Sequence, residues 1–370
     1  MATAASAPPP ALTFPRPIFA AVSPHPFLQA HLSADKSAIR ANGRAAHEFR
    51  APGVNTGSLT HCNGSAVVRL GNTSAVCGVR AEILREEDTP GTSAPAGVNA
   101  SGEIEDDDDD NDNSTSSSED DDLESLRLLV PNIELSTGST PSSIPGNAPS
   151  TLAQSLITRL RSLLHSTHIL HTRDLRITYT PPTNAADPDA PPAPEVKGYW
   201  VLYLDIVFLS LDGCLFDAAW LSVLAALSHT RLPHAYYDPE FDGILCSDDP
   251  TDATSLNLHG LPVPSSFAVF EGRGDADEKE DWVLSDPDAF EEGVCGEVVT
   301  VTVDQGTIRR VEKSGGGCGE GGHEGVVKRA VERWGLWRGC EGEGVRRVVD
   351  LERGKDGVET AHISFARVYQ

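Results

Sequence analysis

The clearest hydrophobic pattern in the chain is an almost continuous run of apolar residues from Trp200 to Leu209. Asp205 is its only polar member, and such a run is typical of a strand covered on both faces. Asp212-Gly213 follows and predicts a sharp turn, and Asp217 stands where a helix N-cap would lie. Four apolar residues then recur at helical spacing: Trp220, Leu221, Leu224 and Leu227. The pattern predicts a strand–turn–helix unit at the centre of the core.

Upstream of this unit the apolar residues occur in short β-prone runs. The turn dipeptides Asn63-Gly64 and Gly71-Asn72 separate them, which favours an antiparallel meander. The runs cover residues 54–62, 65–70 and 74–83. A further strand, interrupted by Pro131, is expected at 123–135, and an amphipathic helix at Thr151–His165.

Downstream, residues 236–256 are acidic and irregular, and regular patterns then return. They predict strands at 266–270 and 282–284, a hairpin of 298–303 with 307–311, and a helix at 326–334. Runs of strands interrupted by helices, without strict alternation, indicate an α/β (α+β) fold in which a mixed β-sheet packs against helices.

Composition suggests how the chain is divided. Residues 1–34 form an extension with a short helix at Pro24–Leu32, residues 35–335 form the folded domain, and residues 336–370 form a tail. The domain has two halves, 35–230 and 231–335. Three segments within it are too polar or too rich in Pro, Ser and Gly to build a core: the disordered acidic insert 86–122, the linker 136–150 and the loop 181–194.

The net charge of −26 is unevenly distributed. Residues Glu103 to Glu124 contain 13 acids and no Lys or Arg, so the rest of the chain carries only −13. This balance gives no sign of a basic nucleic-acid-binding face, and it argues against a free-standing RNA-binding protein.

The seven cysteines are scattered and form no Cys-x-x-Cys pair, which fits buried thiols in a reducing compartment. No apolar run reaches the roughly 18 residues of a membrane span. Residues 1–34 lack acids, as organelle transit peptides do, but Arg16 is their only Arg or Lys, which favours an ordinary extension.

Three blocks of sequence carry a resemblance to a known family. The first runs from Arg44 to Arg50 and continues through Asn55–Ser58, Gly64–Ala66 and Leu70–Thr73. The second runs from Trp200 to Ala219. The third comprises Pro264–Phe270, Ser285–Pro287 and Glu291-Glu292.

In this order and spacing, the blocks resemble the RNase PH family, and in particular the ring subunits of the eukaryotic RNA exosome. The resemblance implies an RNase PH-like fold and partners that are other RNase PH-like subunits, RNA-binding cap proteins, an associated hydrolytic exoribonuclease and RNA. It implies a role in rRNA maturation and mRNA turnover in the nucleus, nucleolus and cytoplasm. No cofactor, metal or membrane is expected.

Active members of this family cleave RNA from its 3′ end with inorganic phosphate, which they hold with a Gly-Thr-Arg loop at a helix N-terminus. That loop falls here on Cys214, Leu215, Phe216 and Asp217. Leu215 and Phe216 lack a hydroxyl and a guanidinium. The negative charge of Asp217 repels phosphate by about 1 kcal/mol at 4 Å in water, and by more where water is excluded.

The acidic pair Glu291-Glu292 lies near the expected position of the family's catalytic acid. Without bound phosphate such an acid has no nucleophile to assist, so the sequence predicts a non-catalytic family member. The alternative is an active phosphate-dependent 3′–5′ exoribonuclease.

Some residues allow two interpretations. Arg159 and Arg161 face either RNA, as basic residues do in related subunits, or only solvent. Asp205, Asp212 and Asp217 are either metal ligands or, respectively, a partnered buried acid, a turn residue and a helix cap. The glycine loop Gly315–Gly317, with Cys318 and His323 nearby, lacks the Gly-Lys-Ser/Thr ending of a phosphate-binding P-loop, and a flexible connection is expected.

Overall fold

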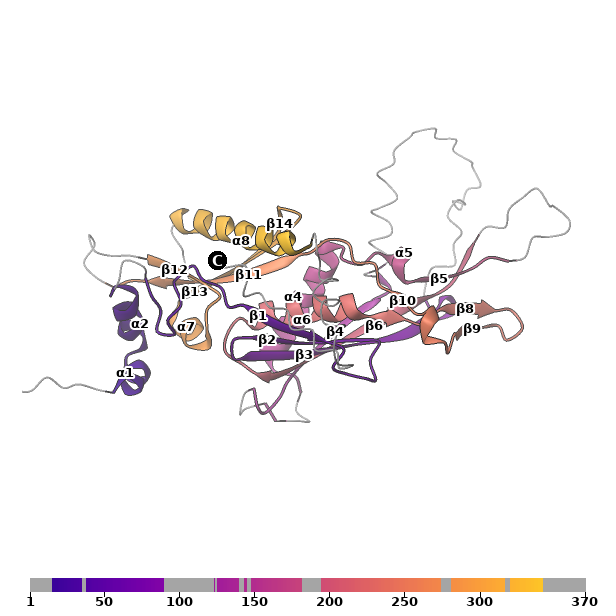
Figure 1. Ribbon diagram of the computed structural model, residues 1–370, viewed down its shortest axis with the longest axis horizontal. Helices are drawn as coiled ribbons and strands as arrows, with labels where there is room; N and C mark the ends of the chain where they lie inside the picture. The colour runs from indigo at the N-terminus through magenta and orange to yellow at the C-terminus, as the bar shows by residue number, and fades with distance from the viewer. Residues whose placement is uncertain are drawn as a thin grey trace, which may run out of the picture.

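A computed structural model describes residues 15–34, 38–89, 123, 125–139, 143–144, 148–181, 194–273, 281–316 and 320–341. Most of the predicted acidic insert, most of the loop 181–194, Cys318 and residues 342–370 lie outside these ranges. The described elements form two larger sheets with helices packed on them, and the sheets occupy successive parts of an elongated molecule (Figure 1).

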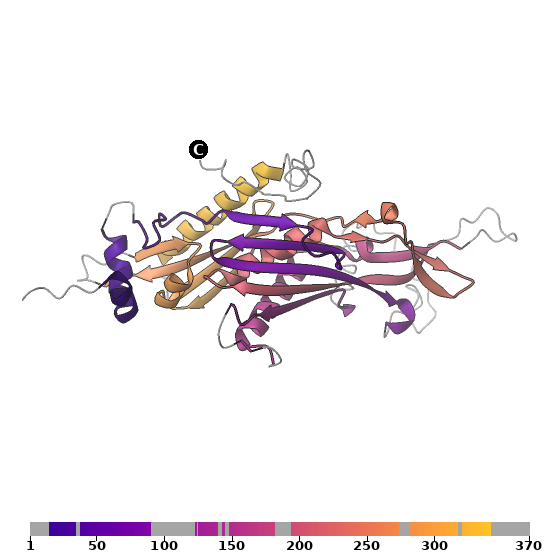
Figure 2. The same cartoon turned by 60° about the horizontal axis from the view of Figure 1, so that its bottom comes forward.

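The larger sheet has six strands. Five follow the order β1-β2-β3-β6-β4, and β5 also pairs with β6. All pairs are antiparallel except β4 with β6, so the predicted mixed sheet is confirmed. The strands are β1 (Pro52–Thr56), β2 (Gly64–Leu70), β3 (Thr73–Arg85), β4 (Leu129–Leu135), β5 (Arg176–Tyr179) and β6 (Glu195–Ser210). Figure 2 shows the long strands β3 and β6 side by side.

Two predictions for this sheet were too broad. The strand expected at 54–62 ends at Thr56, because Gly57 turns the chain with a φ of +80°. The strand expected at 123–135 begins at Leu129. Pro131 lies within β4, and a residue without an N–H is tolerated there because β4 is an edge strand.

Strand β6 is buried on both faces only in its first half, where Tyr199 and Val201, on the same face as Asp205, are 5 and 9% exposed. The expectation of two buried faces was therefore wrong for its second half. Leu202, Leu204, Ile206 and Phe208 are almost fully buried, whereas Asp205 and Leu209 on the alternate face are exposed. Mostly antiparallel pairing leaves this second face without a covering helix layer. Beyond Val201, the apolar residues Tyr203 and Val207 of this face are only partly buried.

The covered face packs against two helices, α4 (Thr151–Thr167) and α6 (Leu215–His229). Ser150 caps α4, accepting a hydrogen bond from the Ala153 N–H at 3.2 Å. Helix α6 is buried on nearly all sides because it lies on β2 and β3 and also touches β11. Its Trp220 is fully buried and donates Nε1–H to the Pro262 carbonyl at 2.8 Å.

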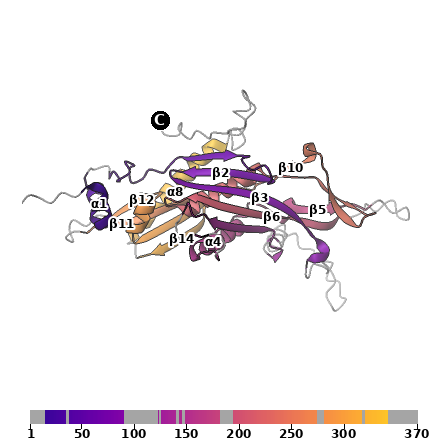
Figure 3. The same cartoon turned by 90° about the horizontal axis from the view of Figure 1, so that it is seen from below.

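The second sheet has the order β12-β11-β13-β14 and is antiparallel throughout. Its strands are β11 (Val263–Glu271), β12 (Asp281–Ser285), β13 (Glu297–Asp304) and β14 (Thr307–Gly315). Helix α8 (Glu320–Glu341) packs on β11, β12 and β13, and it continues past residue 335. In Figures 1 and 3 this sheet lies toward the end of the molecule that carries the N-terminal helices.

Several smaller elements complete the chain. The predicted helix at Pro24–Leu32 is present as α2. The sequence did not indicate the remaining ones: α1 (Arg16–Val22), η1 (Glu86–Asp88), α5 (Thr172–Leu175), β7 (Arg231–Leu232), β8 (Ala235–Asp238), β9 (Gly243–Cys246), η2 (Pro250–Asp252), β10 (Thr254–Ser255) and α7 (Ala289–Val294). Five of them lie in the segment from 231 to 256, where β7 pairs with β10 and β8 with β9.

Candidate functional site

The loop between β6 and α6 lies against the start of α7. Gly213 and Cys214 have φ angles of +73° and +49°, so the reversal is completed one residue before the helix. A Cβ at Gly213 would lie 2.5 Å from the Pro287 carbonyl oxygen, so only glycine allows this approach. The turn that leads into Cys214–Asp217 therefore packs against residues 287–289. We call Cys214–Asp217, on which the resemblance places the family's phosphate loop, the degenerate loop.

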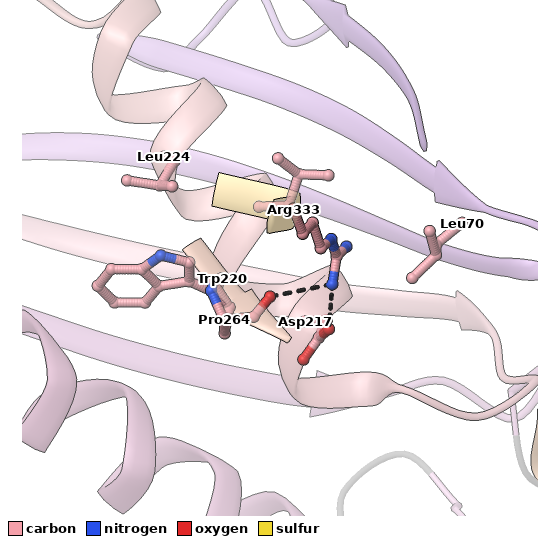
Figure 4. Close-up of a pocket in the computed structure, with 7 residues that line it drawn as sticks. Leu70, Asp217, Trp220, Leu224, Pro264 and Arg333 are labelled. Atoms are coloured by element: carbon pink, nitrogen blue, oxygen red, sulfur yellow. Dashed lines mark hydrogen bonds and ion pairs between the residues drawn. The ribbon is translucent and has the colours of Figure 1, made fainter. Parts of the chain in front are cut away.

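Asp217 is not the helix cap that the sequence predicted. The cap position is Cys214, and Asp217 lies inside the first turn of α6. Its buried carboxylate accepts a hydrogen bond from Ser266 Oγ at 2.6 Å. It accepts another from Arg333 Nη1 at 3.1 Å (Figure 4). Burial raises the pKa of Asp217, and the charge of Arg333 offsets only part of this rise.

Arg333 connects α8 to the rest of the site. Its Nη1 also donates to the Pro264 carbonyl at 3.1 Å, and its guanidinium lies 4.4 Å from the centre of the Phe49 ring. Asp217 and Arg333 thus join α6, α8, β11 and the segment before β1 through one buried ion pair. Both line a small cavity of about 10 Å³ beside Trp220.

Glu292 binds the backbone at the start of α6. Its Oε1 accepts a hydrogen bond from the Cys214 N–H at 2.7 Å. Backbone N–H groups at a helix N-terminus can bind anions, and here the protein's own carboxylate takes this N–H. Burial raises the pKa of Glu292, and Asp217 and Asp286 add to this rise. The loop is therefore surrounded by acids.

Asp286 and Arg50 form the strongest ion pair near the loop. The Arg50 Nε and Nη2 donate to the two carboxylate oxygens at 2.8 Å each, and the Arg50 N–H adds a third bond at 2.7 Å. Burial alone would raise the pKa of Asp286, but Arg50 holds it below its usual value. Arg50 Nη1 also donates to the Asp212 carbonyl at 2.8 Å. The Arg50 guanidinium therefore makes its hydrogen bonds to acceptors of the protein itself.

Arg40 and Glu291 form a second buried pair at 3.1 Å. Arg40 is fully buried and also donates to the carbonyl oxygens of Ala46, Glu48 and Ser285. Glu291 caps α7, because its Oε2 accepts the Asp288 N–H at 3.0 Å. Burial raises the pKa of Glu291 despite Arg40. In this arrangement Glu291 holds the N-terminal segment and α7 in place.

The two arginines predicted to face RNA differ. The Arg159 guanidinium lies 4.1 Å from the centre of the Phe216 ring, and its Nε donates to Glu312 at 2.6 Å. These contacts fix Arg159 over the degenerate loop, where it neutralises Glu312. Arg161, on the same helix, is exposed. The structure therefore brings only Arg159 to the loop.

The candidate metal ligands do not converge. Asp205 is exposed and accepts from Asn132 Nδ2 at 3.2 Å, so it has a partner but is not buried as predicted. Asp212 accepts from Asn72 Nδ2 at 3.2 Å, whereas Asp217 is bound by Arg333. Within the described ranges, no three His, Cys, Asp or Glu side chains are grouped as a metal would require. Cys318 and the side chain of His323 lie outside those ranges.

Sequence reasoning did not assign roles to four residues at this site: Arg40, Arg50, Asp286 and Arg333. Arg50 and Asp286 stand within the sequence blocks that resemble the RNase PH family, which was the one available signal. Arg40 and Arg333 lie outside those blocks. Charged residues are usually exposed, so only the fold shows that these are buried.

The chain is similar in sequence to known proteins. The pattern of the 3′ exoribonuclease family, domain 1, matches residues 48–233. The exosome complex component rrp43 of Schizosaccharomyces pombe is 28% identical over 82% of this chain and 90% of its own. The exosome complex component Rrp42 of Thermococcus gammatolerans is 25% identical over 76% of this chain and 81% of its own.

Solved structures share the fold. The chain superposes on a subunit of the Archaeoglobus fulgidus exosome with RNA bound to the active site, with a TM-score of 0.58, 20% identity and coverage of 87% of this chain and 98% of the other. For an archaeal exosome core the TM-score is 0.53, with 20% identity over 86% and 96%.

The chain belongs to the 3′ exoribonuclease family of RNase PH type. The predicted RNase PH-like fold is confirmed. None of the helices in the described ranges is long and apolar enough to cross a membrane.

Proposed function

We propose that this chain is a non-catalytic RNase PH-like subunit of the RNA exosome ring, supporting 3′–5′ RNA processing and degradation. Its relatives carry exosome names, and the alignment spans most of the length of both proteins. The proposed partners are other RNase PH-like subunits of a hetero-hexameric ring, RNA-binding cap proteins, a separate hydrolytic exoribonuclease and RNA. The proposed locations are the nucleus, nucleolus and cytoplasm.

One observation carries the proposed inactivity. The Cys214 N–H that opens α6 is bound by Glu292, and Leu215 and Phe216 stand where active members have Thr and Arg. A phosphate would have to displace a carboxylate at 2.7 Å from this N–H and would meet Asp217 close by. The buried guanidinium groups of Arg50 and Arg333 are already paired with Asp286 and Asp217.

Exposed apolar residues support assembly. Leu209 on the open face of β6 and Ile308 and Val311 on β14 are about half exposed, at 51, 45 and 55%. Strand β14 is also an edge of the second sheet within the described strands, so it has backbone groups to offer a neighbour. We assign these surfaces to ring contacts and Arg161, which is exposed, to RNA.

Reconstitution tests the assignment. The tagged chain is expected to co-purify with other RNase PH-like subunits, identified by mass spectrometry, as a particle whose native mass equals one copy of each of six subunits. Val311→Lys should weaken this assembly while leaving the thermal melt unchanged. Ile144→Lys, at a 61% exposed apolar position outside both sheets, serves as the matched control. A chain that stays monomeric when the other subunits are present would contradict the proposal.

A further inference from the structure

The hairpin of β8 and β9 stands at the end of the molecule opposite α1 and α2 (Figures 1 and 3). One of its faces is anchored to the larger sheet. The ring of Tyr237 lies 5.1 Å from that of Tyr179, and Lys197 Nζ lies 5.1 Å from the centre of the same Tyr237 ring. The Ile244 side chain fills the space above Gly198. These contacts hold the hairpin against the larger sheet.

The opposite face carries partly exposed apolar side chains, and the His234 ring stacks on that of Tyr236 with the ring centres 6.3 Å apart. Tyr236 and Leu245 are cross-strand partners, and they are 44 and 38% exposed. Phe241, at the turn, is 77% exposed. Isolated exposed apolar residues are ordinary, but three large ones on one short hairpin are typical of an interaction site.

The turn that carries Phe241 is held in one conformation. Asp238 Oδ1 accepts the Glu240 N–H at 2.9 Å, and the Tyr237 hydroxyl donates to Asp242. Asp242 adopts a left-handed conformation with a φ of +48°. Because these contacts already order the turn, the turn would lose little conformational entropy when a partner binds Phe241.

The surroundings of this face are acidic. Asp238, Glu240, Asp242, Asp248, Asp249 and Asp252 lie in or directly after the hairpin, and residues 232–272 contain no Lys or Arg. All but Asp238 are exposed. RNA and anionic lipid are repelled by such a surface, and so is a second copy of this chain, whose net charge is −26. The negative charge of this face therefore favours a positively charged binding partner.

We propose that the open face of the β8–β9 hairpin binds a basic peptide segment of a partner protein. Phe241, Tyr236 and Leu245 receive its apolar side chains, and the surrounding carboxylates pair with its Lys or Arg residues. Strand β9 pairs only with β8 among the described strands, so its outer edge also offers backbone groups to an extended peptide. The site is separate from the degenerate loop and does not depend on the ring assignment.

Three synthetic 12-residue peptides serve as probes of the full-length chain: one of Lys alternating with Leu and Phe, one of Lys with Ser, and one of Glu with Leu and Phe. Fluorescence anisotropy gives each Kd. The first peptide is expected to bind most tightly, and Phe241→Ser/Leu245→Ser should weaken it by about tenfold or more, as truncating an apolar anchor does. Val22→Ser, at a 76% exposed position on α1, should leave the Kd unchanged.

Hydrogen exchange locates the bound peptide. The Lys/Leu/Phe peptide should slow exchange in residues 235–246, and a variant lacking residues 103–124 should bind it with the same preference over the Lys/Ser peptide. Equal binding of the two Lys peptides, binding that is lost with residues 103–124, or protection elsewhere would each overturn the proposal. So would tightest binding of the acidic peptide.

Discussion

The buried pair of Asp217 and Arg333 gives the sharpest test of how the site is built. Asp217→Ala leaves the Arg333 guanidinium buried with only the Pro264 carbonyl and Ser265 Oγ as acceptors at Nη1. Arg333→Met leaves the Asp217 carboxylate with Ser266 alone. Each substitution therefore removes the ion-pair partner of a charge in a site where both side chains are at most 7% exposed.

Removing one partner of a buried ion pair costs about 3–5 kcal/mol, because the remaining charge keeps its desolvation penalty. The helix-cap interpretation of Asp217, in contrast, predicts a loss of only about 0.5–2 kcal/mol for Asp217→Ala. It predicts no effect of Arg333 on that loss. With a urea m value of about 2 kcal/mol per M, a loss of about 4 kcal/mol lowers the midpoint by about 2 M.

Urea unfolding followed by tryptophan fluorescence measures these losses. Trp220 and Trp334 are buried on α6 and α8, the two helices that the pair connects. The double variant Asp217→Ala/Arg333→Met should be more stable than the sum of the single losses predicts, by about 1–3 kcal/mol. Additive losses would refute the pairing.

The pH dependence supplies a second criterion. Burial already raises the pKa of Asp217 above its usual 3.8, and removing Arg333 raises it further. A folded-state pKa above the unfolded value means that the folded state loses stability as pH rises from 3.8 through the folded pKa. The deficit of Arg333→Met relative to wild type should therefore be larger at pH 8 than at pH 5. An equal deficit at both pH values would refute this reasoning.

Three further predictions concern the same region and the acidic insert. Asp286→Asn should lower the unfolding free energy most near neutral pH. In urea titrations its difference from wild type should shrink as pH falls below 3.8, because the lowered pKa of Asp286 contributes stability only while Asp286 is ionised. Gly213→Ala should lower the unfolding free energy by at least about 1–2 kcal/mol, since its φ is positive and its Cβ would meet Pro287; Gly293→Ala, with open space around it, is the control. Deleting residues 106–122 should change the melting temperature little, because loop closure costs only about 0.6 kcal/mol per doubling of length; a large drop would show that the segment is structural.

Periodicity was sufficient for most of the long strands and helices. The apolar run at β6, the turn dipeptides of the meander and the 304–306 turn of the last hairpin all mark local structure, and local rules decide such elements. The sequence did not reveal the β8–β9 hairpin because its strands have only four residues each, too few to show a clear alternation, and Pro239 and acidic residues lie between them.

The site could be predicted only in part. The assignment of Cys214–Asp217 as a degenerate phosphate loop stays a prediction, because it rests on a hydroxyl and a guanidinium that are missing from the sequence. Sequence reasoning misassigned Asp217, because local capping rules do not include Arg333, which lies 116 residues away. Arg40 reaches Glu291 across 251 residues, and nothing near either residue indicates that both are buried. Such pairs are set by the packing of separate elements.

The central claim is that this family member does not catalyse phosphorolysis. The purified chain, alone and in a reconstituted ring without the hydrolytic nuclease, is incubated with 5′-labelled single-stranded RNA, inorganic phosphate and Mg²⁺. The account predicts no nucleoside diphosphate from the chain alone, and no decrease in the ring's release when Glu291→Gln/Glu292→Gln is introduced in this subunit. Phosphate-dependent release by the chain above a mock preparation, abolished by the same double substitution, would contradict it.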